Sequence, residues 1–216
     1  MKIYLSPSLQ EHNVGVGDFG TEMHRAFQVT GLTATYLVNA GHKVRTSLQP
    51  WSELEASALL AKVVNDSNAW GADVHVCLHT NAGPPAADGT LVLHYPGSAK
   101  GKRLAECVYK RLAAVSPGSD LGVASEPVFY ETRKANAVVA YVEACYHTNA
   151  VEARDYVFAR KLYAWAIAAG VLEYFGEAVP VKPVASFESI RVPRPLREPA
   201  WWADLEAYLQ RAEKTG

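Results

Sequence analysis

The sequence predicts an α/β protein with a single, mostly parallel twisted sheet and helices on both faces, followed by a C-terminal linker and a short helix. Two patterns indicate this class. Short apolar runs alternate with longer helical segments over residues 1–176, and some of these runs stop at turn-forming residues, as buried parallel strands do. The length of 216 residues allows one substantial core with an appendage.

The first part of the chain is expected to alternate strands and helices. Thr21 has the residue type of an N-cap, and Gly41 stands where a helix stop is expected. Ser52 and Glu55 have the spacing of a capping box at the start of the next helix. We therefore predict strands at residues 1–5, 42–47 and 72–83, and helices at 21–40 and 52–71.

The second part continues the pattern. Leu104, Val108 and Leu112 recur at four-residue spacing, which predicts one apolar helix face. Residues 126–135 show no clear pattern. We predict strands at residues 89–95 and 137–149, and helices at 98–115 and 150–176.

The composition changes after residue 176. Five prolines fall within 20 residues, which excludes a regular helix or central strand and predicts an extended linker over 177–199. Residues 200–216 form the expected amphipathic helical tail. The chain is thus divided into a domain over 1–176, the linker and the tail. The prolines are Pro180, Pro183, Pro193, Pro195 and Pro199.

Charge and cysteine content exclude several classes of function. The net charge of −1 gives no basic bias, so we expect no nucleic-acid partner. Cys77, Cys107 and Cys145 are odd in number and widely spaced, which favours reduced core residues over a disulfide frame. The N-terminus lacks a basic segment followed by an apolar run, so we expect synthesis in the cytoplasm without a signal peptide. No run of 18 apolar residues occurs, so we expect no membrane insertion.

Four side chains share one position in the predicted topology. His12 follows the first strand, Glu22 opens the first helix, His79 ends a strand, and Glu143 lies near the end of the last strand. Ligands of open α/β sheets bind outside the carboxyl ends of the strands. Two histidines and one carboxylate are the ligand set of several catalytic zinc sites, which leaves Glu143 as general base or acid.

Each of these residues also has a purely structural interpretation. Glu22 could serve only the helix dipole, His12 could be a solvated loop residue, and His79 could be a satisfied core histidine. Glu143 is harder to dismiss, because a carboxylate between apolar neighbours in a buried strand must be paired, protonated or functional.

Four segments together resemble the zinc-dependent N-acetylmuramoyl-L-alanine amidases, in the branch found in phage endolysins and bacterial autolysins. They are "YLSPSLQEHNVGVGDFGTE", "VVNDSNAWGADVHVCLHTNAG", "GSAKGKRLAECVYKRL" and "YETRKANAVVAYVEACYHTNAVEARDYV". The resemblance covers residues 2 to about 176. It implies peptidoglycan as substrate, one zinc ion held by His12, Glu22 and His79, and Glu143 as the catalytic residue. It also implies action on the cell wall after release or export.

The chain departs from this family pattern at three places. Many members carry the first histidine in an Asp-Pro-Gly-His-Gly turn, whereas residues 6–11 here read Ser-Pro-Ser-Leu-Gln-Glu before His12. Val138 stands where a proline is frequent, and Thr148 where an aspartate is frequent. The first departure alters the loop before His12, and none of the three removes a proposed ligand.

Several alternatives remain open at this stage. Asn81 could place substrate or order its own loop, and Glu131 could replace Glu143 as the base. A zinc peptidase cutting within the stem peptide would use the same residues. Thiol catalysis by Cys145 with His147, or a wall-binding module without catalysis, are the other rivals.

The tail has two possible roles. Trp201, Trp202 and Tyr208 could stack on sugar rings, but aromatic residues at helical spacing more often pack against protein. We expect the tail to dock on the catalytic domain or to mediate self-association.

Overall fold

The computed structural model describes residues 1–47 and 56–183 of the chain, and six strands of this part form one sheet in the order β2-β1-β3-β6-β4-β5. All neighbouring strands are parallel except β4 and β6, which are antiparallel. The predicted class, a single and mostly parallel sheet, is confirmed. The strands are β1 (Lys2–Pro7), β2 (Lys43–Thr46), β3 (Val74–Asn81), β4 (Thr90–His94), β5 (Asp120–Ser125) and β6 (Val138–Tyr146).

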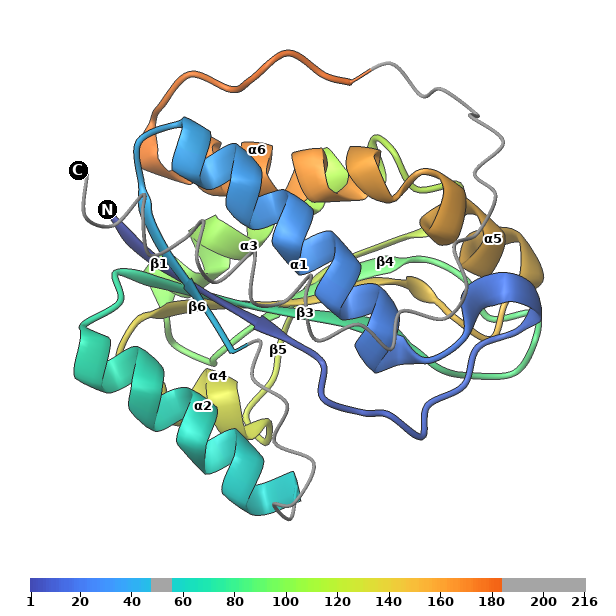
Figure 1. The fold of residues 1–216 in the computed structure, drawn as a ribbon, viewed down its shortest axis with the longest axis horizontal. Coiled ribbons are helices and arrows are strands. Elements are labelled where there is room, and N and C mark those ends of the chain that lie inside the picture. Colours follow the sequence, from blue (N-terminus) through green and yellow to red (C-terminus); the bar gives the residue numbers. More distant parts are fainter. Residues whose placement is uncertain (48–55, 184–216) are drawn as a thin grey trace, which may run out of the picture.

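Helices cover both faces of the sheet (Figure 1). One face carries α1 (Glu22–Asn39), α3 (Ala99–Ala113) and α6 (Arg160–Phe175), and the other carries α2 (Ala56–Trp70) and α4 (Tyr130–Lys134). The largest cluster of buried apolar side chains lies between the sheet and the first of these layers. The remaining helical segments are the short 3-10 helix η1 (Gly17–Phe19) and α5 (Ala150–Phe158).

Helices α3 and α6 approach each other closely at one glycine. A Cβ atom at Gly170 would lie 2.4 Å from the Cα atom of Val108, so only a residue without a side chain fits there. The backbone contact explains why Gly170 is tolerated inside a helix, where glycine is otherwise destabilising.

Local sequence signals explain both ends of α1. The hydroxyl of Thr21 accepts a hydrogen bond from the backbone N–H of His24 at 3.3 Å, which satisfies a free donor at the helix start. Gly41 has a positive φ of 88° immediately after the helix and its cap residue. Both signals were predicted, and they fix the position of Glu22 as the first helical residue.

Three elements differ from the sequence-based prediction. The helix expected over 150–176 is divided at Ala159, whose ψ of 15° departs from helical geometry without a glycine or proline to signal it. Strand β5 was not predicted, because it is a largely exposed edge strand without apolar alternation. Helix α4 lies in the stretch without a clear pattern.

The C-terminal predictions are only partly covered by the structure. Residues 177–183 form neither helix nor strand, and the indole N–H of Trp165 donates to the Pro180 carbonyl oxygen at 2.8 Å. The capping box at Ser52 and Glu55, the rest of the linker and the tail at 200–216 lie outside the described residues. None of the described helices is long and apolar enough to cross a lipid bilayer.

Candidate functional site

The carboxyl ends of β1, β3 and β6 meet at one edge of the sheet, because these strands are parallel neighbours. His79 lies near the end of β3, and Glu143 is its Cα partner on β6. Glu22 begins α1 at the same edge, where its backbone N–H donates to the Asn13 carbonyl oxygen at 2.8 Å. The structure thus brings Glu22, His79 and Glu143 together, while their chemical roles stay predictions.

Glu22 and His79 form a buried pair. The Glu22 Oε1 and His79 Nδ1 atoms are 2.9 Å apart, and the two residues are 1% and 7% exposed. The Thr80 N–H donates to the same oxygen at 3.2 Å, and the Asn13 amide donates to Glu22 Oε2 at 2.7 Å. Burial alone would raise the pKa of Glu22, but these contacts lower it overall. The pKa of His79 is raised, because its bond to Glu22 and the Glu143 charge outweigh burial.

Glu143 lacks such a partner. Its Oε2 atom is buried and has no hydrogen-bond partner among the described residues. Burial raises the pKa of Glu143 to about 7; the charge of His79 opposes this shift, and that of Glu22 adds to it. A carboxyl group that titrates near neutral pH can both accept and return a proton, as a general acid/base must.

The imidazole of His79 is part of an aromatic stack. The ring of Tyr141 lies 4.4 Å from that of His79 with an interplanar angle of 20°, so the two rings are stacked. Tyr141 also contacts Phe129, and the centroids of these two rings are 4.8 Å apart. The imidazole plane of His79 is therefore held by packing as well as by Glu22.

His12 is not part of the cluster. Its side chain is 94% exposed and lies 3.5 Å from Glu11, so the structure does not bring it together with Glu22 and His79. The neighbouring Asn13 contacts Glu22 instead, and its amide also donates to Gln10 Oε1 at 2.7 Å. The prediction that the site contains His12 is not met by this arrangement, because the loop after β1 turns the adjacent residue inward.

The structure assigns Asn81 a local contact. Its Oδ1 atom accepts the Ala82 N–H at 2.8 Å, which orders the turn after β3. Of the two roles predicted for Asn81, the ordering of its loop is the one with an observed contact.

The proposed thiol pair is not assembled. Cys145 is fully buried in the main core, where burial raises the pKa of its thiol well above the usual range. His147 Nδ1 is 2.9 Å from the Thr80 hydroxyl, and its ring stacks on Phe19 at 5.5 Å. Each residue thus has a structural role, so the alternative of Cys–His catalysis finds no support in the geometry.

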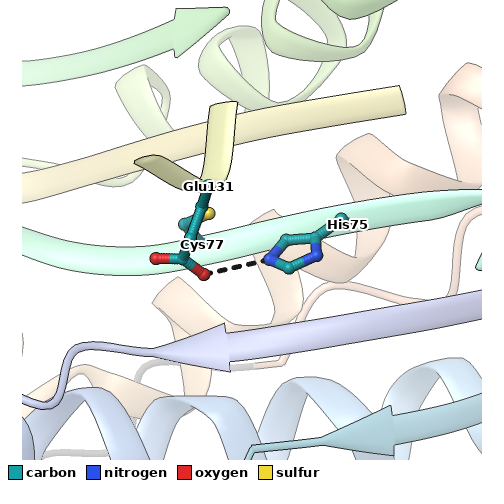
Figure 2. Close-up of side chains that lie close together, drawn as sticks. All are labelled: His75, Cys77 and Glu131. Carbon is teal, nitrogen blue, oxygen red and sulfur yellow. Dashed lines mark hydrogen bonds and ion pairs between the residues drawn. The ribbon is translucent and has the colours of Figure 1, made fainter. Parts of the chain in front are cut away.

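A second buried polar cluster lies on the same strand as His79. Figure 2 shows Glu131 of α4 beside His75 and Cys77 of β3, with a 3.1 Å contact between Glu131 Oε1 and His75 Nε2. His75 Nδ1 is 2.9 Å from the Ser67 hydroxyl. The sequence indicated part of this cluster, because His75, Cys77 and His79 alternate along one strand and so share a face. No sequence pattern placed Glu131, the third residue of the cluster, beside them.

Two groups of residues could therefore hold a metal ion. One donor atom each from His75, Cys77 and Glu131 lie within 4.8 Å of one another. In the other group, Glu22 and His79 provide two donor atoms 2.9 Å apart. Two ligands of a tetrahedral zinc ion lie about 3.3 Å apart, so this pair needs only a small separation to fit zinc. The unpaired oxygen of Glu143 beside it distinguishes this group as the one suited to catalysis.

The chain is similar to known proteins in both sequence and structure. The family described as N-acetylmuramoyl-L-alanine amidase matches residues 3–173. The catalytic domain of the CD27L endolysin targeting Clostridia Difficile is similar in structure, with a TM-score of 0.70 and 20% identity over 80% of this chain and 97% of that chain. No curated protein sequence matches significantly.

Two further solved structures have the same fold. The CwlV catalytic domain from Bacillus (Paenibacillus) polymyxa var. colistinus has a TM-score of 0.70 and 20% identity, covering 82% of this chain and 99% of that chain. AmiC2 of Nostoc punctiforme has a TM-score of 0.70 and 21% identity, covering 82% and 98%. At these identities the structural matches establish the fold, and the family match establishes the relationship.

The raised pKa of Glu143 predicts a pH-dependent stability. In metal-free protein, the folded state holds a proton on Glu143 between its usual pKa of 4.5 and about 7, and the unfolded state does not. The free energy of unfolding should therefore fall as pH rises through this window. Glu143→Gln should lack this fall and be more stable than wild type above pH 7 by about 3 kcal/mol.

Urea unfolding of both proteins across this pH range measures the difference. The histidines outside the site contribute to both proteins alike, so the comparison reports Glu143 together with its effect on the neighbouring His79. Parallel curves for wild type and Glu143→Gln would show that Glu143 is not the group with the raised pKa.

Proposed function

Because the chain belongs to the N-acetylmuramoyl-L-alanine amidase family, we propose that it cleaves the amide bond between N-acetylmuramic acid and L-alanine in peptidoglycan with the aid of one zinc ion. The observation that carries the zinc-dependent mechanism is the buried Glu22–His79 pair beside the unpaired oxygen of Glu143. Such a pair of donors next to a carboxyl group that titrates near pH 7 fits a hydrolytic site.

Glu22 and His79 would hold the zinc, with His12 as the third protein ligand. When bound, zinc would polarise the amide carbonyl and lower the pKa of a water molecule. For His12 to take part, the loop after β1 must turn so that His12 takes the place of Asn13 beside Glu22. The proximity of the adjacent Asn13 to Glu22 Oε2, at 2.7 Å, supports this proposal, because the loop backbone already lies against the site.

Glu143 would move the proton. As a carboxylate it would accept a proton from the attacking water and then deliver it to the nitrogen of L-alanine, because an amine anion is too poor a leaving group to depart unprotonated. The stacked Tyr141 and the Glu22 contact would keep the His79 ring from rotating out of the site.

A second candidate function is binding of the cell wall without catalysis. The position of His12 favours it, because only two of the three proposed ligands are assembled in the structure. A zinc peptidase acting within the stem peptide is a further alternative, which shares the site and differs in the bond cut.

Mass spectrometry of fragments released from purified cell walls separates these functions. The amidase releases peptides with a free L-alanine N-terminus and leaves intact glycan strands, and a chelator should stop this release. Release of shorter stem fragments would indicate a peptidase, and binding without release would indicate a wall-binding module.

The proposed ligands predict the zinc content of variants. His79→Ala should weaken zinc binding by more than about 100-fold, because one of the preassembled donors is lost. His12→Ala should also weaken it if the loop exchanges this residue into the site. Elemental analysis and competition with a chromophoric chelator give the zinc content and affinity.

The matched control is His24→Ala, which removes an imidazole that contacts Gln28 on α1. It should bind zinc like wild type. Full zinc occupancy in His79→Ala would refute the ligand assignment, and unchanged affinity in His12→Ala would exclude His12 as the third ligand.

The role of Glu143 predicts a loss of turnover without a loss of metal. Glu143→Gln preserves the shape of the side chain but cannot accept a proton at neutral pH. Hydrolysis should fall by about 10² to 10⁴, the usual contribution of a general acid/base, while zinc binding is retained. Free L-alanine N-termini released from cell walls and zinc content are measured on the same preparation.

Glu106→Gln is the control, because Glu106 is exposed and lies on α3, where its carboxylate is 3.8 Å from Lys102. It should hydrolyse walls like wild type. Near-normal turnover by zinc-loaded Glu143→Gln would move the base to another residue such as Glu131, and loss of zinc would make Glu143 a ligand.

Burial of Cys145 predicts that the thiol is dispensable. Cys145→Ala should retain most of the hydrolytic activity, and alkylating reagents should leave native Cys145 unmodified in peptide mass mapping, which separates it from the partly exposed Cys107. Loss of activity in a folded Cys145→Ala protein that still binds zinc would restore thiol catalysis as the better explanation.

A further inference from the structure

On the face of the sheet under α4, neighbouring side chains come from β3 and β6. Cys77 and His79 of β3 are the Cα partners of Tyr141 and Glu143 of β6. His75, Cys77 and His79 occupy alternate positions on one face of β3, so the His75–Cys77–Glu131 cluster lies two residues from the proposed ligand His79. A change in one group can reach the other through the packing between them.

Glu131 is the buried anchor of α4. The residue is 3% exposed, His75 is fully buried, and their side chains are 3.1 Å apart. Burial would raise the pKa of Glu131, but hydrogen bonds from His75 and Ser6 and the charges of His75 and His79 lower it overall, so a carboxylate is maintained there. The anchor is thus a buried carboxylate–imidazole contact placed below a helix of five residues.

Such an anchor contributes more to position than to stability. A buried ion pair often stabilises a fold no better than apolar residues of the same volume, because desolvation offsets the attraction. A helix as short as α4 is not stable alone and needs tertiary contacts to take one position. Asn68 contacts the backbone at the end of α4, at Lys134 and Asn136, while the buried side chain of Glu131 bonds to His75 of β3.

The anchored segment reaches the catalytic edge through aromatic contacts. Phe129 is the residue immediately before α4, and its ring lies 4.8 Å from that of Tyr141. Tyr141 in turn stacks on His79 at 4.4 Å. A continuous path of contacts therefore joins Glu131 to the ring whose Nδ1 atom faces Glu22.

The cluster itself is complete without a metal ion. Both ring nitrogens of His75 have partners, and Glu131 bonds to His75, Ser6 and Cys77. None of the cluster's atoms is among the buried polar atoms without a partner in the described chain. Only three donors converge, so the geometry favours a hydrogen-bonded anchor over a second metal centre.

We propose that Glu131 is a positioning residue of the active site: by fixing α4, it holds Phe129 against Tyr141 and thereby keeps the His79 ring oriented toward Glu22. The consequence for catalysis rests on the proposed amidase function, whereas the effect on the His79 ring does not. The effect on the His79 ring and the effect on catalysis can therefore be tested, and refuted, independently.

The first test examines the ring in metal-free protein. The ¹H–¹³C NMR resonance of the His79 imidazole, assigned by its loss in His79→Ala, reports stacking on Tyr141. Glu131→Gln and Phe129→Ala should both shift or broaden it, while the resonance of His42, at the far end of the sheet, stays unchanged. The control Glu106→Gln should alter neither resonance.

The second test is a double-mutant cycle in the zinc-loaded protein. Glu131→Gln and Phe129→Ala should each lower kcat/KM by about 10-fold, and the double variant should lose little more, because both changes break one path of contacts. A loss that multiplies to about 100-fold would mean that the two residues act independently, and it would overturn the proposal.

Three further outcomes decide the proposal. An unchanged His79 resonance in folded Glu131→Gln would overturn it, as would a metal in native protein that is lost in Cys77→Ala. If Glu131→Gln does not fold, Phe129→Ala still decides, because Phe129 is 36% exposed and its truncation should be tolerated. An unchanged resonance there would likewise reject the path of contacts.

Discussion

The arrangement of the sheet edge where β1, β3 and β6 end depends on the buried contact between Glu22 and His79. This contact joins the first residue of α1 to the end of β3, two elements 57 positions apart in the chain. Thr21 fixes where the helix starts, and the backbone N–H of Thr80 fixes the second contact of the carboxylate. Because an unpaired charge would be costly at this depth, either residue alone would destabilise the fold.

Three carboxyl groups near the end of β3 have pKa values that are moved in different directions. Glu22 and Glu131 each face a histidine, and their pKa values are lowered despite burial. Glu143 has a buried oxygen without a hydrogen-bond partner, and burial raises its pKa to about 7. Environments that separate the pKa values of neighbouring carboxyl groups also separate their roles. Two of them are suited to hold a charge, and the third to exchange a proton.

Much of this arrangement could be predicted from the sequence, because strand order and direction decide which residues share an edge. The proximity of Glu22, His79 and Glu143 follows from that rule. Glu131 could not be placed, since it lies in a five-residue helix with no periodic pattern and its partners are more than 50 positions away. The inward position of Asn13 could not be predicted for a different reason: residue types do not determine which of two adjacent loop residues turns inward, so His12 as a ligand stays a prediction.

In the proposed zinc site, the loop after β1 would therefore decide how readily the metal binds. Asn13 bridges Gln10 and Glu22, so the observed loop satisfies Glu22 Oε2 with an amide in place of an imidazole. Exchange for His12 must break this hydrogen bond to a charged group, at a cost of about 1.5–3 kcal/mol. Only a ligand that binds the exchanged loop better by at least that amount can shift the equilibrium. A zinc ion bound by three protein ligands meets this condition, and its measured affinity would be lower than the intrinsic one by the cost of turning the loop.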